Sequence, residues 1–584
     1  MRRLITVAFS VVFVSAAHAD IIYVNTDSQT NGPGTSWTTA FVSLEDGLAA
    51  ASAGDEVWVA AGTYSLTGAR ESVFNIPGGV SVYGGFVGGE ASPAERPADF
   101  SQSATILSGL TNNAYTVVLL GPGTSPTLLD RVIIQDGNSD GATLVGTMNG
   151  GGMFANLRSD LTLNDVLFRN CEAVDNGAGL YAFREKGATT TLTMNGVRFL
   201  QCDAEGRGGG AAISVDTTLV NCEFSNCEAY RGGGLYCEDS VTIDIADSTF
   251  TENTATDLYG GGILFELGGS GQSNIDRSVF ADNVALNSGG GGIAYTELGS
   301  HNLRESTLRG NRVEGNSASG GAIMTFLTGS NVVNIESCLI TGNEAAFVGA
   351  GIHATPTSNS ITRLANCTVV GNRSINGAVG AINYTSGEII LRNTIVWGNS
   401  TVSPIAQQAW SLGGSAIAGV TVANSIIHHL GVVQPPPAGS NNTSDDPMFD
   451  DIDGPDDLIG TEDDNASLMP GSPAIDAGNS NDVISSSGLD VNGDPRFADD
   501  TGTADSGISN GVDPVVDIGA AEFQGTTPSD CVADVNNDGM LTPTDFTAWI
   551  NAFNNNLPEC DQNSDGSCTP TDFTAWIANF NAGC

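Results

Sequence analysis

Positive charge is the scarcest property of this 584-residue chain. The chain has 20 Lys and Arg against 66 Asp and Glu, a formal net charge of −46, and Lys186 is its only lysine. Such a surface repels phosphate backbones, which argues against nucleic acid as a partner. The same charge disfavours binding to anionic membranes and to polyuronate substrates.

Proline and long apolar runs are also scarce. The 21 prolines and 75 glycines show no glycine at every third position, which excludes collagen and proline-rich disorder. Beyond the N-terminus no segment is long and apolar enough to span a bilayer, which takes ~20 residues. Hydrophobic residues still make up 40 % of the chain, enough to form a core.

The N-terminus has the composition of an export signal. Arg2 and Arg3 precede an apolar run that ends in Ala17-His18-Ala19. A basic start, a short apolar stretch and small residues before a cleavage point are typical of a secretory signal peptide. We therefore expect residues 1–19 to be removed and the mature protein to be secreted, where disulfides form and no membrane span is left.

A repeat fills the middle of the chain. An apolar residue followed three positions later by Asn or Cys recurs at steps of 25 to 32 residues, and a glycine cluster follows each of the first eight pairs. The pairs are Phe168/Cys171, Phe199/Cys202, Phe224/Cys227, Phe250/Asn253, Phe280/Asn283, Leu308/Asn311, Ile340/Asn343, Val369/Asn372 and Val396/Asn399. Periods of this size are typical of stacked repeat units.

The segments between these markers predict strands. Residues 161–164, 241–245 and 391–396 alternate between apolar and polar side chains, and they are bounded by Gly or Asn. Between residues 20 and 440, only residues 41–51 have an amphipathic pattern of helical length. Short strands that recur once per repeat predict a parallel β-helix over residues 20–440, and we expect it to be monomeric.

Stacking would place equivalent residues of successive coils above one another. Asn side chains at an inward turn would then form a hydrogen-bonded ladder along the axis. Cysteines occupy the Asn position (Cys171, Cys202, Cys227) or lie two residues before the apolar one (Cys222, Cys338, Cys367). We expect these thiols to be small buried apolar groups; a disulfide among the clustered ones is the alternative, and a metal site is a third.

Candidate catalytic residues in the repeat are Asp203, Glu205 and Glu228. They cluster in sequence beside Arg207 and Arg231, one coil apart. A glycoside hydrolase needs two carboxylates ~5–9.5 Å apart, which stacked coils can supply. We favour the alternative interpretation, a salt-bridged surface.

Three tyrosines of the repeat are candidate sugar-stacking residues. Tyr181 and Tyr236 occupy equivalent positions, and Tyr295 lies one residue further along its coil. Pointing outward they would stack on sugar rings; pointing inward they would fill the core, which we favour.

Several motifs resemble those of known β-helix families. Residues 250–253, 280–283 and 320–323 resemble motifs of polymorphic outer-membrane proteins, and residues 54–64, 83–86 and 105–109 resemble the first coils of secreted right-handed β-helix proteins. Residues 446–449, 471–478 and 516–519 resemble the closing segment of the choice-of-anchor Q group. The resemblance implies an all-β, right-handed, pectin-lyase-like solenoid and says little about activity.

Residues 441–525 differ in composition from the repeat and are expected to close the β-helix. Residues 441–524 hold 20 acidic side chains and one basic one, Arg496. The acidic run 451–464 could wrap further calcium in an oxygen-rich loop. We favour the alternative, a solvated acidic cap over the open edge of the last coil.

Two twelve-residue segments near the C-terminus, 534–545 and 561–572, have EF-hand chemistry. Oxygen donors stand at positions 1, 3 and 5, Gly at 6, a carbonyl donor at 7, Thr at 9 and Asp at 12. The predicted calcium ligands are Asp534, Asn536, Asp538, Met540, Thr542, Asp545 and Asp561, Asn563, Asp565, Ser567, Thr569, Asp572. Position 12 is Asp in both loops instead of the usual Glu, and the shorter side chain extends less far toward the calcium ion.

One helix is predicted after each loop. Thr542 and Pro543 start the first helix, and Phe546, Trp549, Ile550 and Phe553 form its apolar stripe, a pattern that the second copy repeats. Two such loops, each followed by a helix, resemble a type I dockerin, which implies that the β-helix is followed by a small all-α, EF-hand-like module over residues 529–584. The Gly583-Cys584 ending of this module is similar to that of GC-type dockerin-anchored proteins.

The dockerin resemblance implies two calcium ions and a cohesin-like or cell-envelope partner. In dockerins, loop positions 10 and 11 face the cohesin; here they are Pro543, Thr544, Pro570 and Thr571. They differ from the hydroxyl pairs common in that family, which points to a different partner surface. Four cysteines in the module allow three pairings, of which we favour Cys531–Cys584 with Cys560–Cys568.

The sequence therefore predicts a secreted, calcium-binding β-helix attached through a dockerin to a cohesin or cell-surface partner. We expect it to be a non-catalytic surface, adhesion or glycan-binding protein, with polysaccharide as a candidate ligand. The alternative is a glycoside hydrolase or polysaccharide lyase delivered by its dockerin.

Overall fold

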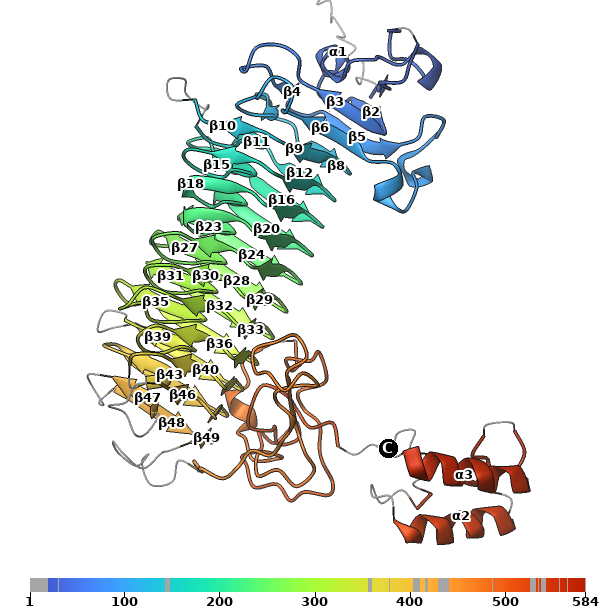
Figure 1. The fold of residues 1–584 in the computed structure, drawn as a ribbon, viewed down its shortest axis with the longest axis vertical. Helices are drawn as coiled ribbons and strands as arrows, with labels where there is room; N and C mark the ends of the chain where they lie inside the picture. Colours follow the sequence, from blue (N-terminus) through green and yellow to red (C-terminus); the bar gives the residue numbers. More distant parts are fainter. Residues whose placement is uncertain are drawn as a thin grey trace, which may run out of the picture.

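The computed structural model describes residues 19–584 apart from 30, 142–147, 356–359, 378, 403–409, 415–418, 429–440, 486, 526–531, 534, 537–541, 556, 564–565 and 583–584. The predicted signal peptide lies outside the described residues except for its last residue. Most of the rest winds into a parallel β-solenoid (Figure 1), which confirms the predicted fold class.

Four sheets run along the solenoid, and we name them A to D. Sheet A contains β1(Ile21–Val24), β2(Glu56–Ala60), β5(Ser81–Phe86), β8(Thr127–Asp130), β12(Leu161–Asn164), β16(Thr191–Asn195), β20(Asp216–Val220), β24(Thr242–Ala246), β28(Gln272–Asp276), β32(Ser300–Arg304), β36(Val332–Glu336), β40(Ile361–Ala365), β44(Glu388–Arg392) and β48(Val420–Ala423). Sheet B contains β3(Gly62–Ser65), β6(Thr105–Ser108), β9(Ile133–Gln135), β13(Leu167–Arg169), β17(Arg198–Leu200), β21(Glu223–Ser225), β25(Thr249–Thr251), β29(Val279–Ala281), β33(Thr307–Arg309), β37(Leu339–Thr341), β41(Thr368–Val370), β45(Ile395–Trp397) and β49(Ile426–Ile427).

The other two sheets complete each coil. Sheet D contains β10(Asn138–Ser139), β14(Glu172–Ala173), β18(Asp203–Arg207), β22(Glu228–Arg231), β26(Thr254–Ala255), β30(Val284–Ala285), β34(Arg312–Val313), β38(Glu344–Ala345), β42(Arg373–Ser374) and β46(Ser400–Thr401). Sheet C contains β4(Phe74–Ile76), β7(Val118–Leu120), β11(Met153–Leu157), β15(Leu180–Arg184), β19(Ala211–Ser214), β23(Leu235–Asp239), β27(Ile263–Leu267), β31(Ile293–Glu297), β35(Ile323–Leu327), β39(Ile352–Ala354), β43(Val379–Tyr384) and β47(Trp410–Gly414).

Left-handed backbone positions turn each coil from one sheet to the next. Before sheet C this position is a glycine with φ between 61° and 78° in eight coils: Gly150, Gly177, Gly208, Gly232, Gly260, Gly290, Gly320 and Gly349. A Cβ on Gly208 would also lie 2.1 Å from the carbonyl oxygen of Ala211. Between sheets A and B the position is often Asp or Asn, such as Asp165 and Asn221, which tolerate this conformation. The glycine clusters of the repeat are therefore corners.

Two ladders run through the core. The rings of Phe168, Phe199, Phe224, Phe250 and Phe280 stack with centroids 4.6–4.9 Å apart. The amide nitrogen of each Asn donates to the side-chain oxygen of the next at 2.9 Å, which confirms the predicted ladder. Its members are Asn253, Asn283, Asn311, Asn343, Asn372 and Asn399.

The cysteines of the repeat are buried and unpaired, as expected. Cys171, Cys202, Cys227, Cys222, Cys338 and Cys367 are free thiols. The backbone N–H of Cys227 donates to the side-chain oxygen of Asn253 at 3.0 Å. Cys227 therefore occupies the position next to the end of the amide ladder. Burial raises the pKa of Cys222 to about 12, which keeps this thiol protonated.

The helical pattern at 41–51 corresponds to α1(Leu44–Ala50). The side chain of Ser43 caps it by accepting from the N–H of Asp46 at 3.2 Å, and Leu44 and Leu48 pack into the core of the first coil. Short 3-10 helices are η1(Trp37–Thr39), η2(Pro93–Glu95), η3(Phe100–Gln102) and η5(Ser480–Asp482).

The closing segment, residues 441–525, lies beside sheet B in Figure 1. Asn442 and Thr443 bond to the last coil, but much of the segment runs back along the side of the solenoid. It contains the antiparallel pair β50(Phe449–Asp451) and β51(Asn465–Leu468). We expected this segment to cap the open edge of the last coil. It instead covers the side of the solenoid.

Apolar outward residues of sheet B explain this position. Leu339, Val370, Ile395 and Ile426 contact buried residues of the closing segment, which include Ala466, Leu468, Ile475 and Ile518. The N–H of Ala520 donates to Thr368 at 2.9 Å, and the hydroxyl of Ser485 donates to Glu305 at 2.8 Å. Without this cover, several coils would expose an apolar patch.

Candidate functional site

The predicted carboxylate cluster lies on the outer face of sheet D. Glu172, Asp203 and Glu228 occupy the same position in three successive coils, and all three side chains are exposed. Partial burial and the charge of Glu205 raise the pKa of Asp203, and partial burial and the charge of Asp203 raise that of Glu228. The structure therefore brings Asp203 and Glu228 together and adds Glu172, which was not predicted although each of the three directly follows a cysteine of the repeat.

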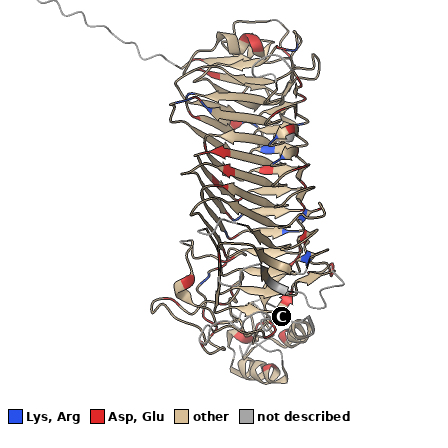
Figure 2. Cartoon of the chain, turned by 90° about the vertical axis from the view of Figure 1, so that its left-hand side faces the viewer, with Lys and Arg blue, Asp and Glu red and all other residues tan. Residues whose placement is uncertain are grey.

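Arg207 and Arg231 do not pair with this column. Arg207 bonds to Glu238 at 2.8 Å, and Arg231 bonds to Glu266 at 3.3 Å, both on the outer face of sheet C. The hydroxyl of Tyr236 donates to both glutamates. Glu238 and Glu266 were not predicted as partners, although they lie 31 and 35 residues after their arginines, about one coil further on. Figure 2 shows how few positions along the solenoid are Lys or Arg, coloured blue.

The three candidate tyrosines have different surroundings. Tyr295 belongs to the core and lies 4.4 Å from the ring of His301. Tyr236 points outward but is 1 % exposed, because Tyr181, Tyr259 and Leu264 pack around it. Tyr181 is half-buried on the outer face of sheet C.

Tyr181 forms an outward aromatic patch with Phe154 and Phe183. The ring centroids lie 5.2–5.7 Å apart, and all three side chains are half-buried. We call these three residues the aromatic patch. Rings that keep one accessible face on a β-sheet can stack on the apolar face of a sugar.

The C-terminal module contains α2(Pro543–Asn555), η6(Pro558–Cys560) and α3(Pro570–Ala582). Residues 542–550 and 569–577 have the same nine-residue sequence. Trp549 and Trp576, equivalent in the two copies, pack together with Ala533 in one core, which also includes Phe546, Phe553 and Phe580. The predicted apolar stripes therefore face each other in part, because Ile550, Phe573 and Ile577 are exposed instead.

The second loop has the geometry of a calcium loop. Gly566 at position 6 has a φ of 82° and donates its N–H to Asp561 at 2.8 Å. The carboxylate of Asp572 is buried and accepts from the N–H groups of Gln562, Asn563 and Thr569 at 2.8–3.2 Å. Burial raises the pKa of Asp572, but these hydrogen bonds outweigh it and lower the pKa overall. An ionised carboxylate thus faces the loop, which fits a calcium ion.

The first loop is described in part. Asp545 is buried and accepts from the N–H of Thr542 at 2.8 Å and from that of Asn536 at 3.4 Å. The predicted ligands Asp534, Asp538 and Met540, and Asp565 of the second loop, lie outside the described residues.

The predicted partner residues are all at the surface. Pro543, Thr544, Pro570 and Thr571 are exposed at the starts of the two helices, and Ile550 and Ile577 are 40 % and 41 % exposed on the same helices. Cys560 and Cys568 form a disulfide, the pairing that we favoured, whereas Cys531 and Cys584 lie outside the described residues.

Two family models match the chain. The right handed beta helix region matches residues 116–305, and the type I dockerin domain matches residues 532–581. Type I dockerin domains bind calcium and attach proteins to cohesins, and proteins that carry them are typically extracellular. In the part of the chain that the structure describes, no helix is both long and apolar enough to cross a membrane.

The solved structures that resemble this chain are distant. Pectate lyase Pel9A is 12 % identical with a TM-score of 0.34, and the match covers 86 % of this chain and 96 % of that one. PfbA, a surface adhesin of Streptococcus pneumoniae, is 10 % identical with a TM-score of 0.31, covering 64 % and 89 %. These scores carry no argument about activity, and no curated protein matches the chain. The chain thus combines a right-handed β-helix region with a C-terminal type I dockerin domain.

Proposed function

We propose that this protein is secreted and displayed outside the cell through its dockerin, with the β-helix as a non-catalytic, glycan-binding rod. The observation that carries the proposal is the duplicated C-terminal module. Two identical helix starts, each behind a calcium-type loop, present the same exposed Pro-Thr pair twice. A duplicated recognition surface of this kind is suited to docking on a partner protein and offers no catalytic group.

Calcium is expected in both loops of the dockerin, one ion in each. In the second loop, Asp561, Asn563 and Asp572 supply side-chain oxygens and Ser567 supplies its carbonyl. The ion would hold the loop in the shape that positions the helix start. This makes attachment dependent on calcium.

The outer face of sheet C favours non-catalytic glycan binding. Of the charged groups that act on Tyr181, Arg207 and Glu238 hold each other in an ion pair at 2.8 Å, and the pair of Arg231 with Glu266 lies on the same face. A glycan can therefore stack on the aromatic patch and bond to fixed charged groups. Neutral sugars are expected, since the net charge of −46 repels polyuronates.

Attachment is tested by binding of the full chain to a panel of immobilised type I cohesins, with calcium and with EDTA. Binding in calcium and its loss in EDTA are expected. Thr544→Asp and Thr571→Asp should each leave one intact surface and retain binding, whereas the double variant should lose it. Failure of every cohesin to bind would overturn the proposed partner class, and retention by the double variant would overturn the proposed surface.

A polysaccharide-degrading enzyme is the second candidate. The neighbouring carboxylates of Asp203 and Glu228 favour it, because both have raised pKa values, which suit an acid and a base. The Asp203→Asn and Glu228→Gln variants would abolish product release if this candidate were right.

A further inference from the structure

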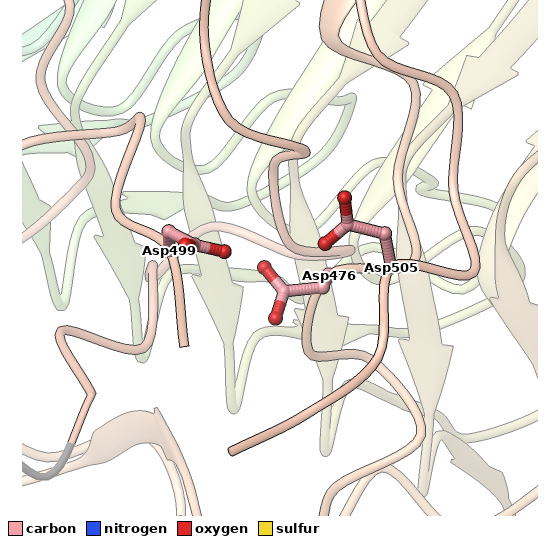
Figure 3. A group of neighbouring side chains, drawn as sticks. All are labelled: Asp476, Asp499 and Asp505. Atoms are coloured by element: carbon pink, nitrogen blue, oxygen red, sulfur yellow. The ribbon is translucent and has the colours of Figure 1, made fainter. Parts of the chain in front are cut away.

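A group of three carboxylates lies in the closing segment, away from the dockerin loops. Asp476, Asp499 and Asp505 point toward one another (Figure 3), and one oxygen of each lies within 4.8 Å of the others. Calcium binds oxygen at 2.3–2.6 Å, so two ligands of one ion lie at most about 5 Å apart. A single ion can therefore contact all three side chains.

Asp476 is the strongest indication of a ligand. Its side chain is 0 % exposed, and neither carboxylate oxygen accepts a hydrogen bond of ordinary geometry from the described residues. Burial and the charges of Asp499, Asp505 and Asp500 raise its pKa to about 6, although the backbone N–H of Asp500 approaches the carboxylate and lowers the pKa in part. A buried carboxylate whose charge is not compensated is destabilising, and a bound cation would compensate it.

The backbone holds Asp476 in this position. Its φ is 50°, a left-handed value, and its N–H donates to Asp517 at 2.7 Å. Its carbonyl accepts from the N–H groups of Ser506 and Gly507, both at 2.9 Å. These bonds tie the Asp476 turn to the loop that carries Asp505, so the site does not depend on side-chain contacts alone.

Among the described residues, no Lys or Arg forms an ion pair with Asp476, Asp499 or Asp505; the arginines that reach this segment pair with Asp482 and Glu522. Arg496 is the only basic residue of 441–524, and it is directed to Glu522 at 3.2 Å and to the carbonyl of Gly519 at 3.0 Å. Asp500 accepts from the hydroxyl of Thr503 at 2.7 Å, within its own turn. The charge of the three carboxylates is therefore left for an external cation.

We propose that Asp476, Asp499 and Asp505 form a calcium site that fastens the 499–507 loop to the part of the closing segment packed on sheet B. Three carboxylates, with water on the exposed side of Asp499 and Asp505, match the oxygen ligands of calcium and its tolerance of irregular geometry. The site is structural, and it is independent of the dockerin.

The proposed site lies outside the acidic run 451–464, in which we considered further calcium from the sequence. In the run 451–464, Asp463 accepts from Thr461 at 2.6 Å and Asp464 accepts from Gly460 at 2.8 Å and from Thr341 at 2.7 Å. Among the described residues of that run, no three acidic side chains come close enough to share an ion. The run makes loop and docking contacts instead.

Hydrogen exchange of the full chain, read by mass spectrometry with and without calcium chloride, tests the site. We expect peptides covering 470–480 and 496–508 to exchange at least tenfold more slowly with calcium. Peptides from the dockerin loops report calcium binding there and serve as the internal reference, so failure of either site is seen separately. Calcium that protects the dockerin but leaves 496–508 unchanged would overturn the proposal.

Two variants make the test specific. Asp499→Asn with Asp505→Asn removes two exposed ligands without changing the core, and should abolish calcium protection at 496–508 and the binding of one ion per chain. Asp494→Asn changes an exposed Asp nearby and should keep both. Full protection in the double variant, or its loss in Asp494→Asn, would contradict the assignment.

Discussion

Trp549 in α2 donates its indole N–H to the carbonyl oxygen of Cys560 at 3.2 Å. Cys560 immediately precedes the second calcium-type loop. Trp576 in α3 makes the equivalent bond, at 3.0 Å, to Ala533, which precedes the first loop. Each helix therefore supports the loop of the other copy, and the module is a reciprocal pair rather than two independent units.

This reciprocity predicts a crossed effect on calcium binding. Trp549→Phe keeps the ring packing but removes the bond to Cys560, which should weaken calcium binding by the second loop about fivefold, since a hydrogen bond contributes roughly 1 kcal/mol. Trp576→Phe should weaken the first loop in the same way. Hydrogen exchange of the loop peptides against calcium concentration measures both. An effect confined to the loop that each helix follows would contradict the crossed arrangement.

Replacing an Asn in the middle of the amide ladder should lower the stability more than replacing one at its end. Asn311 is fully buried, accepts from the backbone and amide N–H groups of Asn283, and donates to Asn343 and to Phe280. Asn311→Cys should lower the unfolding free energy by about 3 kcal/mol, because several buried groups lose partners.

Asn253→Cys is the matched control. Asn253 stands at the end of the ladder, beside Cys227, which bonds to it through the backbone alone. This variant should cost clearly less than Asn311→Cys in thermal or denaturant unfolding. Equal losses would mean that the ladder adds nothing beyond packing.

Acid should destabilise the β-helix partly through His301. Burial lowers the pKa of His301 to about 3, and its Nδ1 lies 2.8 Å from the hydroxyl of Ser273. Between pH 6.5 and 3 the His301 side chain is protonated in the unfolded state but neutral in the folded state. The free energy of unfolding therefore falls as the pH drops through this range. At pH 4.5 the loss is about 2.7 kcal/mol, two pH units at 1.36 kcal/mol each.

His301→Val removes this titration, and Val333 fills the same position in the next coil. The fall in Tm between pH 7 and pH 4.5 should be smaller in the variant than in the unchanged protein, even if its Tm at pH 7 is lower. An identical fall in both proteins would exclude His301 as a source of acid sensitivity.

Arg496 should hold the closing segment on the solenoid. The Arg496–Glu522 pair is 0 % exposed, and the guanidinium also donates to Ser337 at 3.3 Å. Arg496→Met leaves Glu522 buried without its partner, which costs about 3–5 kcal/mol, and residues 441–525 should become sensitive to limited proteolysis. Adding Glu522→Gln should restore part of the resistance.

The exposed pair Arg312–Glu314 provides the control. Its side chains are 46 % and 49 % exposed, and such pairs contribute about 0–1 kcal/mol. Arg312→Met should leave the digestion pattern unchanged. Equal effects of the two variants would show that burial of the Arg496 pair is not what fastens the segment.

The sequence predicted the features that depend on local pattern and repetition. The Phe and Asn ladders follow from residues spaced one coil apart, and Cys560 pairs with Cys568 only 8 residues away. These features were accessible because a solenoid repeats the same contacts, so one coil predicts the next.

The sequence did not predict how the irregular closing segment packs. Asp476 and Asp505 are 29 residues apart with no metal-type spacing, and the dense acidic run 451–464 was the more visible candidate. Their meeting depends on the long-range docking of Ile475 and Ile518 against sheet B. Likewise, the partners of Arg207 and Arg231 became clear only when the register of sheet C was known.

The most direct test of the proposed non-catalytic role is to incubate the full chain with calcium and a panel of neutral and anionic polysaccharides. New reducing ends and unsaturated products are measured together with glycan retained on immobilised protein. We predict retention of a neutral glycan, weakened at least tenfold when Tyr181 and Phe183 are replaced by Ala, and no product from any polysaccharide. Product release that is lost in Asp203→Asn or Glu228→Gln would contradict the account and make the protein an enzyme.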